Sequence, residues 1–121
     1  MKRVAVTGLG VISPVGNDVP TFWNALCSGT CGIGPITKFD ATDYPVKLAA
    51  EVRDLDPKQY MEKLDILHSD VYTHFAMAAA CQAVADSGIA GTLDAERVGV
   101  YIGSGIGGIA TFMTEHSKLL N

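Results

Sequence analysis

The longest uninterrupted apolar stretch of this chain predicts a buried helix. Between Phe75 and Ala85 only Gln82 is polar, and alanine is the commonest residue. A helix that is apolar on every side is covered on every side, and alanine lets neighbouring backbones come close. We expect this helix to run from about Asp65 to Ser87, to present its first turns to solvent, and to end at Gly88.

Two further helices are predicted on its N-terminal side. Apolar residues recur there at i, i+3, i+4 and i+7, which gives the first helix one core-facing stripe. Asn17 or Asp18 caps this helix, Pro20 suits its first turn, and Gly29 stands where a C-terminal cap is expected. The stripe consists of Val19, Phe22, Trp23 and Leu26. A cap followed by proline predicts a second, short helix over residues 56–63.

Three segments predict β-strands. Residues 4–6 and 98–102 are short β-branched and aromatic runs closed by glycine, a pattern typical of buried parallel strands. Residues 45–53 alternate instead, which predicts a half-buried strand, and the proline that opens them favours an edge position. The apolar face of this strand is Val46, Leu48, Ala50 and Val52. Residues 30–44 are rich in glycine, threonine and aspartate and are predicted to be loop.

Four glycines join the strand at 98–102 to a predicted helix at 109–120. They are Gly103, Gly105, Gly107 and Gly108. So many glycines indicate main chain that needs a positive φ or comes very close to a ligand or a neighbouring element. The spacing also satisfies the dinucleotide fingerprint G-x-G-x-x-G, with strand before and helix after. Tight packing of the helix on the strand is the alternative explanation.

Composition excludes several classes of function. The chain has 121 residues, of which 48% are hydrophobic and 18% charged, with a net charge of −4, which is typical of a heavily buried α/β protein. Its basic residues form no stripe, so we expect no nucleic-acid partner. Without a membrane-length apolar run or a signal peptide, we expect a cytoplasmic protein, no membrane association, and free thiols. The strands are too few to cover the alanine-rich helix, so we expect the N-terminal piece of a larger α/β protein.

The sequence gives little support for a metal site or a nucleophile. A metal site would have to combine Cys27, Cys31, His68 and His74. The two histidines are six positions apart and so point to different faces of a helix, which favours solvent-facing histidines and no metal. Cys81 lies among alanines without a basic partner, so we interpret it as a small buried hydrophobe. His116 is interpreted as a surface residue.

Four blocks of the sequence resemble one family. The blocks are VAVTGLGVISPVGN at 4–17, FWNALCSGTCGIGPITKFDATDYPVKLAAEV at 22–52, AMAAACQAVADSGI at 76–89 and RVGVYIGSGIGGI at 97–109. In this order they resemble the β-ketoacyl-acyl-carrier-protein synthases that elongate chains in type II bacterial fatty-acid synthesis. The resemblance implies a thiolase-like fold layered α-β-α-β-α, in which residues 1–121 form an incomplete N-terminal segment of the first of two similar halves, and a homodimer when full length.

The resemblance also implies a reaction, a decarboxylating Claisen condensation in fatty-acid or polyketide chain elongation. An acyl chain would condense with malonyl-acyl-carrier protein, with malonyl and acyl thioesters as substrates, acyl-carrier protein as partner, and no cofactor. The family's Cys-His-His set lies beyond residue 121, so this chain would contain no catalytic residue and be inactive alone. Two other functions stay open, a dinucleotide-binding oxidoreductase and a non-catalytic chain-length partner subunit.

Five residues match functional positions of the family. Ile106 corresponds to the far end of the acyl pocket, where a branched side chain limits the acyl chain, and Gly105 and Gly107 form the turn around it. The family's carrier-protein docking helix corresponds to residues 63–72. Basic character is limited there to Lys63 and the titratable His68, which are the expected docking residues.

Overall fold

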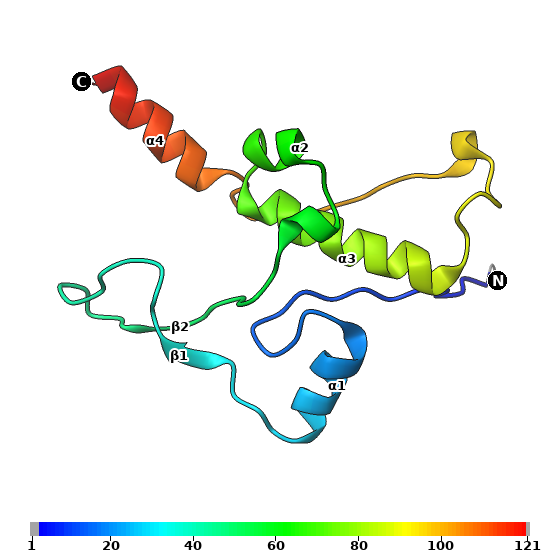
Figure 1. The fold of residues 1–121 in the computed structure, drawn as a ribbon, viewed down its shortest axis with the longest axis horizontal. Coiled ribbons are helices and arrows are strands. Elements are labelled where there is room, and N and C mark those ends of the chain that lie inside the picture. Colours follow the sequence, from blue (N-terminus) through cyan, green and yellow to red (C-terminus); the bar gives the residue numbers. More distant parts are fainter. Residues whose placement is uncertain (1–2, 121) are drawn as a thin grey trace.

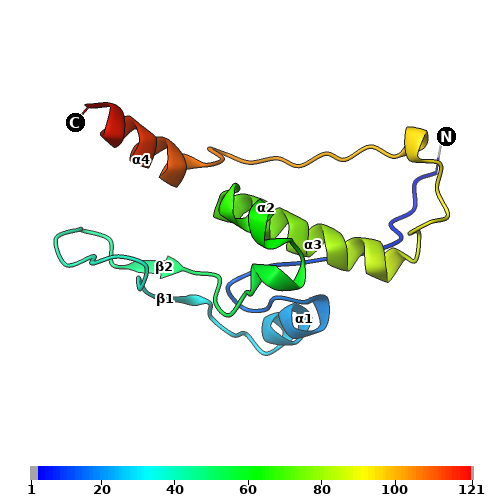
Figure 2. The ribbon, with the colours of Figure 1, turned by 45° about the horizontal axis from the view of Figure 1, so that its top comes forward.

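The computed structural model describes residues 3–120. Its elements are α1 (Val19–Cys27), β1 (Ile33–Pro35), β2 (Leu48–Ala50), the 3-10 turn η1 (Pro57–Gln59), α2 (Lys63–Leu67), α3 (Val71–Ser87), the 3-10 turn η2 (Ala95–Arg97) and α4 (Ile109–Leu120). Figure 1 shows α3 at the centre, with an extended N-terminal segment and an extended segment leading to α4 running along it. When the molecule is turned by 45° about the horizontal axis, α4 still projects away from the rest (Figure 2).

The predicted long helix is two helices. α2 ends at Leu67 and α3 begins at Val71, because the residues between them favour helix ends over helix interiors. The Ser69 hydroxyl donates to the carbonyl of Asp65 at 2.5 Å, and Asp70 stands in extended conformation at the N-cap of α3. The predicted end is confirmed, since Gly88 closes α3 with φ +63°.

The N-terminal segment packs on α3 through bare backbone. A Cβ built on Gly8 would lie 2.1 Å from the carbonyl oxygen of Ala83, and one built on Gly10 would lie 1.9 Å from that of Ala79. Such contact is possible only between glycine and a helix face of small residues. The expectation that alanines admit a neighbouring backbone is confirmed at this face.

Two polar side chains of α3 bind the same segment. Asp86 Oδ2 accepts from the backbone nitrogen of Leu9 at 2.9 Å, and Gln82 Oε1 accepts from that of Val11 at 3.2 Å. The Gln82 amide also donates to the carbonyl of Asn17 at 2.7 Å. Side chains of α3 thus hold the backbone that follows the predicted strand at 4–6.

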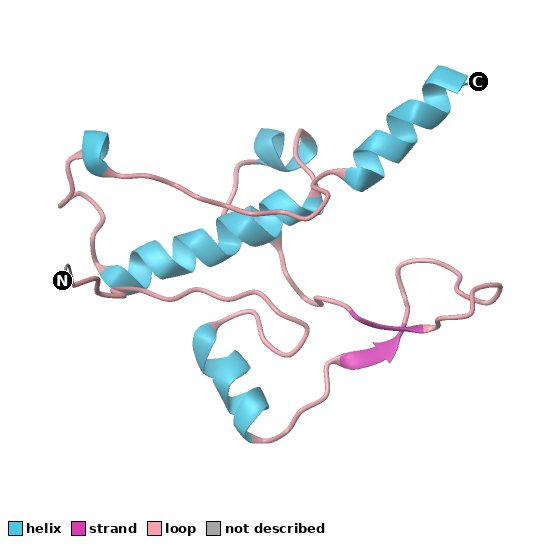
Figure 3. Cartoon of the chain, turned by 180° about the vertical axis from the view of Figure 1, so that it is seen from behind, coloured by secondary structure: helices cyan, strands magenta, loops and turns pink. Residues whose placement is uncertain are grey.

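Neither predicted glycine-closed strand is part of a sheet. Residues 4–6 and 98–102 are extended but carry no strand assignment. An extended segment becomes a strand only beside another backbone that exchanges hydrogen bonds with it, and within residues 3–120 no such neighbour meets them. Figure 3 shows that the sheet in this part of the chain is the short β1–β2 pair. The two strand predictions are therefore wrong for the chain as folded here.

The β1–β2 pair corrects two other predictions. It is antiparallel, with Ala49 of β2 opposite Gly34 of β1, so part of the predicted loop at 30–44 is a strand. Leu48 and Ala50 are exposed, Ala49 is half-buried and Glu51 is only 8% exposed. In β2 the face that was predicted to be covered, with Leu48 and Ala50, is therefore the exposed face. The opposite face is the covered one, because the side chain of Glu51 is buried there.

Glu51 is buried by hydrogen bonds from one short loop. Its two carboxylate oxygens accept from the backbone nitrogen of Thr37 at 3.1 and 3.2 Å, and Oε2 accepts from the Thr37 hydroxyl at 2.6 Å. The backbone nitrogen of Lys38 donates to Oε1 at 3.3 Å. These donors, the Thr37 hydroxyl first, hold the pKa of Glu51 below its ordinary value of 4.5, against the opposing effect of burial.

We expect the loop at Thr37 to lose order in acid. A carboxyl whose pKa is lowered by folding stabilises the fold above its unfolded pKa, and this contribution is lost as the pH falls through the lower folded value. Hydrogen exchange of the Thr37 and Lys38 amides, measured in the folded protein from about pH 6 downward, should show weaker protection below the ordinary pKa of a glutamate. Glu51→Gln carries no titrating charge and should abolish this pH dependence. Equal protection across the range in the unmodified protein would contradict the role of Glu51.

α1 is capped as predicted, by the second of the two candidates. Asp18 accepts from the backbone nitrogen of Thr21 at 2.8 Å and from its hydroxyl at 2.9 Å. Asn17 instead donates to the carbonyl of Arg53 at 2.6 Å. Gly29, with φ +68°, follows the helix end and confirms the predicted stop.

The apolar stripe of α1 is covered along only part of its length. Val19 and Phe22 are half-buried, whereas Trp23 is 63% exposed and Leu26 is exposed as well. The prediction of a core-facing stripe is therefore right for Val19 and Phe22 and wrong for the other two. Within residues 3–120, Trp23 is left mostly uncovered and Leu26 about half uncovered.

The short helix predicted over residues 56–63 is one 3-10 turn. η1 covers only Pro57–Gln59, and Asp56 caps it by accepting from the backbone nitrogen of Lys58 at 3.1 Å.

No helix of residues 3–120 is both long and apolar enough to cross a membrane.

The structure is open. Its accessible surface is 9837 Å², whereas a compact monomer of this mass exposes about 6,200 Å². Ala78 is the one fully covered apolar residue among residues 3–120, and no large side chain there is fully buried. The expectation that α3 is covered on every side is therefore wrong within this chain.

Candidate functional site

The glycine-rich turn between residues 103 and 108 is held by its own hydrogen bonds. The backbone nitrogen of Gly107 donates to Ser104 Oγ at 2.9 Å. Gly107 has φ +72°, and its carbonyl accepts from the backbone nitrogen of Ile109 at 3.0 Å, where α4 begins. A positive φ favours glycine, so the backbone requirement predicted for this turn is confirmed at Gly107.

The glycines of this turn are not equivalent. A Cβ on Gly108 would lie 1.8 Å from Oδ2 of Asp70, so the main chain does come very close to a neighbouring element there. A Cβ on Gly103 or Gly105 would meet nothing within 4 Å among the described residues, and neither has a positive φ. The predicted close approach is therefore real at Gly108 and wrong at Gly103 and Gly105, where the described chain leaves open space.

The neighbour at the turn is the N-terminus of α3. Asp70 Oδ1 accepts from the Thr111 hydroxyl at 2.7 Å, across 41 positions of sequence. The ring of Tyr72 lies 3.9 Å from the Cβ position of Gly107, at ordinary contact distance. Asp70, Tyr72 and Thr111 were not predicted as site residues. Only the capping preference of Asp70 was visible in the sequence.

Ile106 projects from this turn with 77% of its surface exposed. A groove of about 390 Å³ runs nearby between the N-terminal segment, α3 and the end of the extended segment before the turn. Its lining reaches Ser104 but does not include Ile106, Gly105 or Gly107. In this chain the predicted pocket residue is an apolar side chain presented outward by a firmly built turn.

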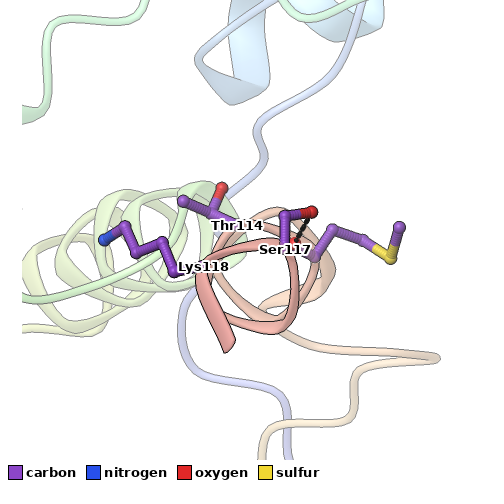
Figure 4. A pocket seen from close by; sticks show the side chains of 4 residues that line it. Thr114, Ser117 and Lys118 are labelled. Carbon is purple, nitrogen blue, oxygen red and sulfur yellow. Dashed lines mark hydrogen bonds between the residues drawn. The ribbon is translucent and has the colours of Figure 1, made fainter. Parts of the chain in front are cut away.

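The larger hollow, shown in Figure 4, lies on α4 alone. Its volume is about 680 Å³ and its lining residues are Met113, Thr114, Ser117 and Lys118. The Ser117 hydroxyl donates to the Met113 carbonyl at 2.8 Å, and Lys118 pairs with Glu115 at 2.7 Å. A hollow lined by one helix is the helix's own exposed surface, and it lacks the convergent groups of a binding site.

The predicted docking residues lie on α2, which is exposed. Lys63 is its first residue and His68 is its C-cap, and both side chains face solvent. Acidic Glu62 and Asp65 stand beside them on the same short helix, and both are also exposed. α2 thus presents mixed charge, with one lysine, to any partner.

The histidines and cysteines do not form one site. His74 is half-buried, with Nε2 3.3 Å from the carbonyl oxygen of Ile66, so its interpretation as a solvent-facing residue is wrong. Cys27 and Cys31 are exposed and Cys81 is half-buried. His116 is exposed, as predicted, and stacks on Phe112 with ring centroids 6.0 Å apart. Within residues 3–120, no three His, Cys, Asp or Glu side chains group closely enough to hold a metal.

Comparison with known proteins supplies the wider context. The family model "Beta-ketoacyl synthase, N-terminal domain" matches residues 1–120. The chain is 48% identical over 120 residues to 3-oxoacyl-[acyl-carrier-protein] synthase 2 of Coxiella burnetii and 46% identical over 120 residues to that of Vibrio harveyi, covering 98% of this chain in each case. It spans 29% of the length of these relatives.

A solved structure shows the same fold. The ishigamide ketosynthase/chain length factor matches with a TM-score of 0.74 and 28% identity, over 96% of this chain and 30% of that one. The predicted fold class, an incomplete N-terminal part of a thiolase-like α/β fold, is confirmed, and so is the sequence resemblance. The chain belongs to the β-ketoacyl synthase family and lies within its N-terminal domain.

Proposed function

We propose that this chain is the N-terminal part of an enzyme that condenses an acyl chain with malonyl-acyl-carrier protein, with loss of CO₂, during fatty-acid elongation. The match of residues 1–120 to the family, with 48% identity to a 3-oxoacyl-[acyl-carrier-protein] synthase 2, supports this proposal most strongly. The same match replaces the dinucleotide interpretation of residues 103–108, because these residues lie within the range that matches the family.

This chain and the rest of the enzyme have different roles in the reaction. Residues 1–121, as the first segment of the first thiolase-like half, contribute no nucleophile and no acid or base. They contribute the turn around Gly105 and Gly107 that presents Ile106 to the end of the acyl pocket. The full-length enzyme works as a cytoplasmic homodimer and needs no metal or nucleotide.

Carrier docking is the second contribution. Lys63 and His68 are exposed at the two ends of α2, where a carrier protein has free access. One lysine beside Glu62 and Asp65 offers weak electrostatic attraction, since exposed charge pairs of this kind are worth about 1 kcal/mol or less. Docking through α2 therefore relies on contacts elsewhere in the enzyme for most of its affinity.

We expect Ile106→Phe to shorten the acyl chains that the full-length enzyme accepts. A larger side chain at the end of a close-packed pocket rejects added carbons at a cost of ~1–3 kcal/mol, or about five- to 150-fold in specificity. Ile106→Ala should instead relax selectivity against long acyl groups. The measurement is kcat/KM across a ladder of acyl-carrier substrates of increasing length.

Ile106→Leu is the matched control, because it conserves volume and should leave the chain-length profile nearly unchanged. Short primers should react at similar rates in all three variants. A uniform loss at every chain length in Ile106→Phe would show that Ile106 is a packing residue and lies outside the pocket.

A second candidate function is that of a non-catalytic chain-length partner subunit. It is favoured by the similarity to the ishigamide ketosynthase/chain length factor. The two functions differ in one covalent step, because only a condensing enzyme transfers the acyl group from its thioester to a cysteine thiolate. Mass spectrometry of the full-length protein after incubation with an acyl-carrier thioester separates them: an added acyl mass identifies the enzyme, and an unchanged mass the partner subunit.

A further inference from the structure

Asp70 stands at the N-cap of α3 but does not use its side chain there. An aspartate in this position normally accepts a hydrogen bond from the second or third amide of its own helix. Asp70 has the extended conformation of a cap, with φ −86° and ψ 164°. Its carboxylate nevertheless accepts no capping hydrogen bond from an amide of α3 within residues 3–120. Its carboxylate is directed instead to a segment far along the chain.

That segment is the start of α4. Asp70 Oδ1 accepts from the Thr111 hydroxyl at 2.7 Å. A Cβ on Gly108 would lie 1.8 Å from Oδ2 and 2.8 Å from Cγ, so the bare main chain at Gly108 is what admits the carboxylate. α4 has no acidic residue in its first turn, and Asp70 supplies from outside the negative charge that a helix N-terminus favours.

The same contact lies next to the turn that carries Ile106. Gly107 is bonded to Ser104 on one side and faces the Tyr72 ring on the other. One residue further on, Gly108 meets Asp70. Ile106 is therefore joined to α3 through two successive glycines whose neighbours are both residues of the first α3 turn or its cap.

We propose that Asp70 is a positioning residue for acyl-chain selectivity: with Thr111 and Gly108 it clamps the start of α4 to the start of α3, and this clamp fixes where Ile106 stands in the pocket. The inference rests on the proposed function, since it needs Ile106 to close the pocket. Asp70 touches neither substrate nor the reacting atoms, and it acts only through the turn.

Thr111→Val tests the clamp with little change of shape, because valine replaces the hydroxyl by a methyl group. In the full-length enzyme, the ratio of kcat/KM for long against short acyl chains should change roughly tenfold, the effect of losing one hydrogen bond to a charged group. Thr111→Ser keeps the donor and should restore the ratio. Asp70→Asn keeps an acceptor oxygen and should fall between them.

A second readout does not depend on activity. Backbone amides of residues 104–109 should exchange hydrogen faster in Thr111→Val than in Thr111→Ser, because the turn loses its anchor on α3. Gly108→Ala provides an independent route to the same state, since its methyl group displaces the Asp70 carboxylate. It should change both exchange and selectivity in the same direction as Thr111→Val.

The outcomes separate this inference from the pocket assignment. If selectivity responds to Ile106→Ala but not to Thr111→Val, the role of Asp70 is overturned and the pocket stands. If neither variant changes selectivity, the pocket assignment fails and the inference falls with it. Unchanged amide exchange in both Thr111→Val and Gly108→Ala overturns the clamp itself. A change in both readouts that Thr111→Ser reverses supports the proposal.

Discussion

Produced on its own, this chain will not unfold as a cooperative monomer. Its surface of 9837 Å² exceeds the value of about 6,200 Å² for a compact protein of its size by more than half. Many large apolar side chains are exposed, among them Trp23, Tyr101 and Phe112. Leaving ten such side chains uncovered forgoes roughly 15 kcal/mol or more, which equals or exceeds the whole stability of a typical domain.

Two measurements on the isolated chain check this expectation. Sedimentation at micromolar concentration should show oligomers or aggregates, because uncovered apolar surface associates. A thermal scan followed by circular dichroism should show a broad change without a baseline-to-baseline transition. A sharp melt from a monomeric species would contradict it, and would mean that the chain covers its apolar faces in some more compact arrangement.

Gly10→Ala should severely destabilise the full-length protein, although it adds a single methyl group. The new Cβ would lie 1.9 Å from the carbonyl oxygen of Ala79 and 2.9 Å from the backbone nitrogen of Ala83. Both are backbone atoms of α3, so no side-chain rotation relieves the overlap, and the N-terminal segment has to leave the helix. Overpacking of a core costs about 1–3 kcal/mol, and we expect a loss at or above the top of that range.

Gly103→Ala is the matched control for this change. It makes the same chemical substitution at a glycine with an ordinary φ and no neighbour within 4 Å among the described residues. Urea unfolding of the two variants beside the unmodified enzyme gives the comparison. Equal midpoints for Gly10→Ala and the unmodified enzyme would show that the contact with α3 is not tight in the complete protein.

Helix ends were predictable from the sequence because their signals are local. Asp18 caps α1, Gly29 and Gly88 follow α1 and α3 with positive φ, and α4 starts directly after the glycines. Strands were predictable only in part, because a strand needs a second backbone: β2 lies within the strand predicted at 45–53, where β1 pairs with it. Residues 98–102 have the right composition and remain extended without a partner. The break at residues 68–70 was missed because its polar residues were expected on solvent-facing first turns of one continuous helix.

The site was predictable in part for the same reason. Glycine spacing identifies the turn, since each glycine marks a backbone requirement that can be read at one position. The contact between Asp70 and Thr111 joins residues 41 positions apart, and neither residue type is unusual where it stands. The resemblance to a family supplied Ile106, whereas only the folded chain brings Asp70 to the turn.

The hydrogen bonds between α3 and the N-terminal segment can form only after a delay during synthesis. They join residues 77, 71 and 65 positions apart, so residues 9–17 are synthesised well before the part of α3 that binds them. At about 5–20 residues per second, the interval between Leu9 and Asp86 lasts roughly 4–15 s. During this interval the backbone amides of Leu9 and Val11 lack the side-chain oxygens of α3 that accept from them in the folded chain, so the segment is free to bind a chaperone.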